Sequence, residues 1–190
     1  MKIGAGMRLF PRENYLKKIR GFYHDDGMIK AITGVRRCGK SCLMQCIAEE
    51  LRAEGGFSIF ITGSNSYLLS GELATKLTGR YIEFEMQTLD FGEYCQMKRF
   101  SELPANPNPV AELDACILEG GFPKAMDYPQ LADKCAYVAA VLQEIFEKDI
   151  RRRVKIKNVS AFNQVRGYVI NSFGAATSLA NKRFRLLIDS

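Results

Sequence analysis

Residues 34–41 read GVRRCGKS, a glycine-rich stretch that satisfies the pattern G-x-x-x-x-G-K-[S/T]. A compact apolar run at residues 28–33 precedes it, and residues 40–54 repeat apolar side chains with a period of 3.6, as a helix does. In a strand, loop and helix of this kind, the loop N–H groups and the positive end of the helix together form an anion cradle. The stretch therefore predicts a phosphate-binding loop.

The residue types in this loop suit a nucleoside triphosphate with Mg²⁺. Gly34 and Gly39 allow backbone geometry that a Cβ would block. Lys40 would reach the β- and γ-phosphates, and Ser41 would offer its hydroxyl to the metal as a ligand. GTP is not favoured, because the guanine-reading pattern N-K-x-D is approached at residues 181–184 but ends in phenylalanine. The expected ATP-binding residues are Gly34, Val35, Arg36, Arg37, Cys38, Gly39, Lys40, Ser41 and Cys42.

The pattern of hydrophobic residues divides the chain into an early part with strands and a late part made of helices. We expect a helix at residues 13–23, buried strands at 28–33 and 57–62, a helix at 66–78 and a strand at 81–86. The pattern then becomes helical, at residues 91–98, 110–119, 131–152 and 159–173. This order predicts an α/β fold, with a P-loop core over residues 1–89 and a helical lid over residues 90–176.

Composition excludes several other classes of protein. No run of about 18 apolar residues occurs and the N-terminus lacks the apolar stretch of a secretory signal, so we expect a cytoplasmic protein without a membrane segment. The six cysteines form no C-x-x-C pair and there is one histidine, which argues against a zinc site or a disulfide framework. The net charge of +6 comes partly from a basic helix at residues 148–157, which suits either a solvated helix end or weak nucleic-acid binding.

A second motif of P-loop enzymes, an apolar strand that ends in an acidic residue, is missing from its usual place. Such an acid holds the metal through water and helps to activate the attacking water. The strand expected after the loop's helix ends in Thr62-Gly63-Ser64. Residues 186–189 read LLID, but they stand at the very end of the sequence, and we interpret them as an apolar tail.

The decapeptide at residues 32–41, ITGVRRCGKS, resembles the I-T-G-x-R-R-x-G-K-S motif of a large prokaryotic group of AAA-type ATP-binding proteins. Residues 61–65, 68–73, 91–94 and 120–123 are also similar to this group. The resemblance implies that Ser64 or Asn65, after the sensor strand, contacts the γ-phosphate or the attacking water. It also implies that Arg80 is an arginine finger that senses phosphate in cis or in trans.

The chain departs from this group in two places. Members carry several tens of residues, with two strands and the acidic motif, between the loop's helix and the sensor strand. They also continue into a winged helix, which residues 177–190 would only begin, as a truncated start or an unstructured tail. The strand order of AAA sheets still places the first and sensor strands side by side, so we expect a reduced sheet of about three strands. Its exposed edge, residues 57–62, would then be a surface for a second copy or a partner chain.

Three hypotheses for the function follow. The first is an AAA-type ATP-binding protein, ancestrally an ATPase, with weak or absent hydrolysis. The second is a small P-loop kinase that uses the arginines at residues 151–153 over the phosphates. The third is a non-catalytic fragment that binds nucleic acid or a partner through the basic helix.

Overall fold

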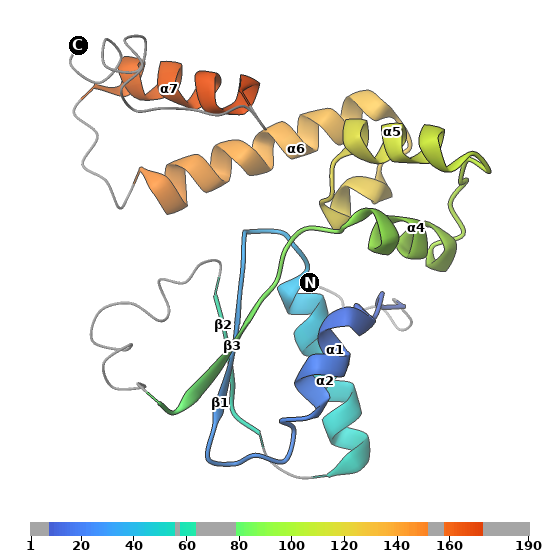
Figure 1. Ribbon diagram of the computed structural model, residues 1–190, viewed down its shortest axis with the longest axis vertical. Helices are drawn as coiled ribbons and strands as arrows, with labels where there is room; N and C mark the ends of the chain where they lie inside the picture. The colour runs from blue at the N-terminus through green and yellow to red at the C-terminus, as the bar shows by residue number, and fades with distance from the viewer. Residues whose placement is uncertain (1–7, 56–57, 64–78, 152–157, 173–190) are drawn as a thin grey trace, which may run out of the picture. The chain divides into compact units, whose positions relative to one another are not determined.

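The computed structural model describes residues 8–55, 58–63, 79–151 and 158–172 (Figure 1). The chain divides into two compact units between Ile145 and Phe146. Among the described residues, the first unit contains a small parallel sheet and most of the helices, and the second contains a π-helical turn and an α-helix. The helix expected at residues 66–78 lies outside the described residues.

The sheet is built around β1 (Ile29–Thr33), with the strand order β2-β1-β3. β2 (Phe60–Thr62) and β3 (Tyr81–Glu85) both run parallel to β1, and Thr33 of β1 pairs with Glu85 of β3. Parallel strands bring their carboxyl ends to one edge, so β1 delivers the glycine-rich loop to that edge. The α/β fold class and the expected neighbours of the first strand are thereby confirmed.

Two helices, α1 (Glu13–Arg20) and α2 (Lys40–Glu54), cover one face of the sheet (Figure 1). In each helix the apolar residues recur at helical spacing and lie on the face toward the sheet, so both helices are amphipathic. α2 has the same bounds as the helix expected from the sequence, and Gly55 ends it with a positive φ of 77°. The buried core between the helices and the sheet consists of Leu16, Ile19, Tyr23, Ile32, Cys38, Leu43, Cys46, Ile47 and Met86.

The rest of the first unit is helical. It contains α4 (Phe91–Phe100), α5 (Pro109–Glu119), a 3-10 helix η2 (Pro123–Asp127) and α6 (Leu131–Ile145). α4 begins with a capping box, in which the Asp90 side chain accepts from the Glu93 N–H and Glu93 accepts from the Asp90 N–H. Two small cores hold these helices together, one of Leu89, Tyr94 and Met126 and one of Phe122, Ala125 and Val141.

The second unit contains a π-helical turn, η3 (Phe146–Ile150), and α7 (Val159–Asn171). The Phe146 ring lies 6.3 Å from the Phe162 ring, and the Arg166 guanidinium lies 5.0 Å from the Phe146 ring. The single helix expected at residues 131–152 is wrong at its end, because α6 stops at Ile145 and the wider π turn follows. One π turn shifts the apolar face of a helix by about one residue, and this shift is too small to be seen in the hydrophobic pattern of the sequence.

None of the helices in the described ranges is both long enough and apolar enough to cross a membrane.

Candidate nucleotide-binding site

The glycine-rich loop lies between the carboxyl end of β1 and the first turn of α2, as the motif predicted. Gly34 has a φ of +131°, and a Cβ added there would lie 2.0 Å from the carbonyl oxygen of Met86. Gly39 has a φ of +103° and is the N-cap of α2. Both backbone conformations are ones that side chains rarely adopt, so the two glycines set the shape of the loop.

The start of α2 has no side-chain cap. Gly39 has no side chain, and the first turn contains no acidic residue. The first N–H groups of a helix have no partner within the helix, and they carry the positive end of the helix dipole. At α2 these groups meet the loop, so the site has the electrostatics that an anion requires.

The Lys40 side chain folds back across the loop. Its Nζ donates to the carbonyl oxygens of Gly34, at 2.8 Å, and Val35, at 2.7 Å, and it lies 3.7 Å from the Cys38 Sγ. Lys40 is 9% exposed, and its two bonds to loop carbonyl oxygens hold the ammonium inside the curve of the loop. A lysine placed here is a positive charge at the centre of the candidate phosphate site.

The other predicted loop residues divide into buried and exposed positions. Cys38 is fully buried, Arg36 is half-buried, and Val35, Arg37 and Ser41 are exposed. Ser41 is the second residue of α2, where an exposed hydroxyl is available to a metal. In the same turn, partial desolvation raises the pKa of the Cys42 thiol and the Asp127 carboxylate adds to the effect, so this thiol is neutral.

Arg37 connects the loop to α6. It is one of the described non-glycine residues with a positive φ, 64°, and its Nη2 lies 3.6 Å from a carboxylate oxygen of Glu144. On the same helix, burial raises the pKa of Tyr137, and the Arg37 guanidinium acts in the opposite direction. The helical part of the first unit therefore approaches the loop from α6.

A second contact to the helical part runs through Gly121. Its carbonyl oxygen accepts from the Leu89 N–H at 2.7 Å, and a Cβ at Gly121 would lie 2.6 Å from the Leu89 carbonyl oxygen. Pro123 follows closely, and its Cγ would lie 3.6 Å from a Cβ at Gly39. The segment GGFP at residues 120–123 thus packs against both the strand exit and the loop.

The sequence did not predict a further buried side-chain contact to the loop, which is made by Arg12. This arginine precedes α1 and is 4% exposed, and its guanidinium pairs with the Glu93 carboxylate through both Nε and Nη2. It also donates to backbone carbonyl oxygens of Cys38 at 3.1 Å, of Gln87 at 2.6 Å and of Thr88 at 3.2 Å. A charged residue before a helix normally lies at the surface, so the sequence around Arg12 gave no signal of this contact. The one related signal was the D-x-x-E capping pattern at residues 90–93, which contains its partner Glu93.

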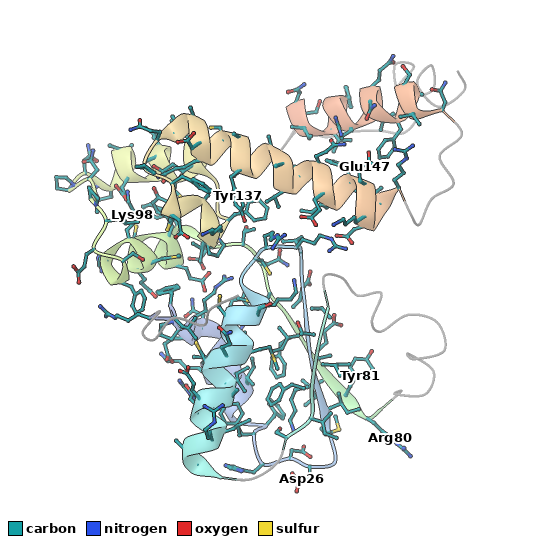
Figure 2. The ribbon with its side chains drawn as sticks, turned by 180° about the vertical axis from the view of Figure 1, so that it is seen from behind. Asp26, Arg80, Tyr81, Lys98, Tyr137 and Glu147 are labelled. Carbon is teal, nitrogen blue, oxygen red and sulfur yellow. The ribbon has the colours of Figure 1, made fainter. Side chains whose placement is uncertain are left out.

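The candidate catalytic residues are not all brought to the loop. β2 ends beside β1, where the Gly63 N–H donates to the Ile32 carbonyl oxygen, but Ser64 and Asn65 lie outside the described residues. Arg80 is exposed and precedes β3, and its carbonyl oxygen accepts from the Ile29 N–H (Figure 2). It therefore stands at the amino ends of the strands, roughly 16 Å from the loop by strand rise.

Two acids on β3, Glu83 and Glu85, are the nearest described candidates for the missing metal-binding acid. The Thr33 hydroxyl donates to Glu83 at 2.6 Å. Phe84 and Met86 pack into the core under α1 and α2, and side chains alternate along a strand, so both glutamates face away from α2 and Ser41. Asp189, the third candidate, lies outside the described residues.

Comparison with known proteins gives one family match. A family model described as an AAA domain matches residues 51–95, from the end of α2 through β2 and β3 into α4. The match supports an AAA-type P-loop family. AAA domains bind nucleotide, usually with Mg²⁺. The matched segment does not include the loop itself, which is identified by its own motif and geometry.

Two relatives are similar over longer stretches. An uncharacterized protein of Methanocaldococcus jannaschii is 33% identical over 131 residues, which are 66% of this chain and 30% of that protein. An uncharacterized protein of Haemophilus influenzae is 26% identical over 234 positions, covering 87% of this chain and 56% of that protein. The chain thus spans 30% of the length of the first relative and 56% of the length of the second. No solved structure matches the chain.

Proposed function

We propose that this protein binds ATP with Mg²⁺ through the loop from Gly34 to Ser41. The observation that carries the proposal is a strand, a glycine-shaped loop and an uncapped helix N-terminus around a buried lysine. Loop amides and helix amides would hold the β-phosphate. The match to an AAA domain supports nucleotide as the ligand.

The side chains of the site would divide the remaining work. The Lys40 ammonium, now bonded to two loop carbonyl oxygens, would turn to the β- and γ-phosphate oxygens without leaving the loop. Ser41, exposed on the first turn of α2, would give its hydroxyl to Mg²⁺. Arg37 would exchange its Glu144 partner for a phosphate oxygen, because the Arg37 side chain is largely exposed and such pairs are weak.

We also propose catalytic roles for Ser64, Asn65 and Arg80, which stand at different places relative to the sheet. Ser64 and Asn65 follow β2, whose carboxyl end lies beside that of β1, so the topology favours a position near the γ-phosphate. Arg80 lies at the opposite end of β3, which leaves action in trans, on the site of a second copy, as its role. β2 is an edge strand of the described sheet, and its outer edge would serve the same assembly.

Hydrolysis is proposed to be slow. Ser41 gives the metal one protein ligand, and Glu83 and Glu85 face away from it. Without an acid to orient the attacking water, the chemical step would slow by about a hundredfold or more. The alignment with the Haemophilus influenzae protein is longer than this chain, so part of that relative has no counterpart here, in agreement with a missing internal segment.

The organisation of the chain is proposed on the same basis. Residues 1–89 would bind nucleotide, residues 90–176 would act as the helical lid, and residues 177–190 would be a truncated start of a winged helix or an unstructured tail. We further propose a cytoplasmic protein. The alternatives of a kinase or a nucleic-acid-binding fragment depend largely on the basic residues 152–157, which lie outside the described residues, and no observation favours them.

Release of phosphate by the purified protein tests the catalytic part of the proposal. We expect MgATP to bind while phosphate appears at the same rate as with Lys40→Ala. Rapid hydrolysis that Lys40→Ala abolishes would contradict slow turnover and would require an acid that completes the metal site. Adding Glu83→Gln and Glu85→Gln to the comparison would then identify it.

A further inference from the structure

Arg12 contacts the candidate phosphate loop and two chain segments beside it. Its guanidinium binds three separate segments: the loop at the Cys38 carbonyl, the exit of β3 at Gln87 and Thr88, and the start of α4 at Glu93. The three nitrogens of this planar group make five hydrogen bonds at once, an arrangement that a lysine does not offer. Arg12 therefore couples the shape of the loop to the position of the helical part.

The surroundings keep this guanidinium in one orientation. Arg12 and Glu93 are 4% and 3% exposed, so solvent does not compete for their hydrogen bonds. The Arg12 guanidinium also stacks on the Tyr15 ring at 4.6 Å, and the Tyr15 hydroxyl accepts from the Gln87 N–H at 3.0 Å. Glu93 is fixed from the other side by the capping box with Asp90.

The loop end of this network is the segment next to Lys40. Cys38 is fully buried, and its carbonyl oxygen points at Arg12 rather than into the site. With that carbonyl turned away, the N–H groups that follow it are left to face the candidate phosphate position. Loss of the contact would let the peptide rotate and present an oxygen, with its partial negative charge, to the anion.

We infer that Arg12, held by Glu93, is a positioning residue that keeps the phosphate loop in its nucleotide-binding conformation. The part of this inference that concerns the nucleotide rests on the proposed function. The effect of Arg12 on the conformation of the loop does not depend on it. A second arginine, Arg20 at the end of α1, provides a matched comparison. It also pairs with two carboxylates, those of Glu13 and Glu50, which lie on α1 and α2 and not in the loop.

The experiment compares Arg12→Lys with Arg20→Lys in the full chain, using two readouts at a temperature where both variants are folded. The first is the rate at which iodoacetamide alkylates Cys38, followed by peptide mass spectrometry, with buried Cys46 as the internal control. The second is the affinity for MgATP, from titration with a fluorescent ATP analogue. The double variant Arg12→Gln with Glu93→Gln, which removes both buried charges together, replaces Arg12→Lys if the latter does not fold.

For Arg12→Lys we expect Cys38 to react about tenfold faster and MgATP to bind about tenfold more weakly, the factor for one lost charge-assisted hydrogen bond. Cys46 should be unaffected, and Arg20→Lys should leave both the Cys38 rate and the affinity near those of the wild type. Unchanged affinity in Arg12→Lys, or slow Cys38 labelling together with weak binding, would overturn the inference. If the wild type binds no MgATP, the proposed function fails, while the Cys38 rates still decide whether Arg12 shapes the loop.

Discussion

Gly34 is subject to two separate constraints. Its φ of +131° is open to glycine and strained for other residues, and the Met86 carbonyl oxygen occupies the place of a Cβ at 2.0 Å. The motif alone predicted that Gly34 allows backbone geometry that a Cβ would block. The structure adds that β3 approaches from behind, so the same residue joins the loop to the sheet.

Replacing Gly34 by alanine should therefore damage both stability and binding. We expect Gly34→Ala to lower the free energy of unfolding by about 3 kcal/mol or more, because the main chain of Met86 or of the loop must move. Denaturant unfolding measures this loss. Gly55→Ala is the matched control, since Gly55 also has a positive φ but has no atom within 4 Å of the added Cβ, and it should cost about 1 kcal/mol. Equal losses in the two variants would contradict the close packing at Gly34.

Residues differ in how readily the sequence reveals their roles. Lys40 and Ser41 were predictable, because a motif with fixed spacing names them. Arg12 was not, because its role depends on burial against Glu93, a residue 81 positions away. Contacts between distant residues leave no periodic pattern in a single sequence.

α1 and α2 are joined at their exposed side by a small ion-pair network. The Arg20 guanidinium binds Glu13 at 2.8 Å, within α1, and Glu50 on α2, where the Tyr23 hydroxyl also donates at 2.8 Å. Hydrogen bonds from Arg20 are the main cause of the lowered pKa of both glutamates. The network is partly exposed, so its contribution is modest and sensitive to salt.

This network predicts part of the protein's acid sensitivity. A carboxyl group whose pKa is lowered in the folded state contributes stability above its ordinary pKa of 4.5, and that stability is lost as the pH falls through the lowered value. Between roughly pH 5 and pH 3 we therefore expect the wild type to lose more stability than Arg20→Gln. Urea unfolding at a series of pH values measures the difference. Parallel pH curves for the two proteins would show that Arg20 does not hold these pKa values down.

Elements with a strong local signal were predicted well. α2 has its expected bounds because its apolar period is regular and Gly55 stops it, and β1 lies between β2 and β3 as expected. The end of α6 was missed, since a π turn at Phe146–Ile150 leaves the hydrophobic period nearly unchanged. The strand expected from residue 57 is observed only from Phe60, where its pairing with β1 begins.

For the molecule as a whole, the sequence predicted the α/β class with a parallel sheet followed by helices. It did not predict the division into two compact units at Ile145, because unit boundaries depend on three-dimensional packing rather than on composition. The relatives extend well beyond the aligned region, and this chain covers 30% and 56% of their lengths.

Nucleotide binding at the loop is tested by thermal unfolding of the wild type and Lys40→Ala, each with and without MgATP. At about 100 times its dissociation constant, the ligand should add about 2.7 kcal/mol to the free energy of unfolding of the wild type. Lys40→Ala should lose most of this gain, because the substitution removes the Lys40 ammonium, a buried positive charge inside the loop. An equal stabilisation of both proteins by MgATP, or none in the wild type, would contradict a nucleotide site at residues 34–41.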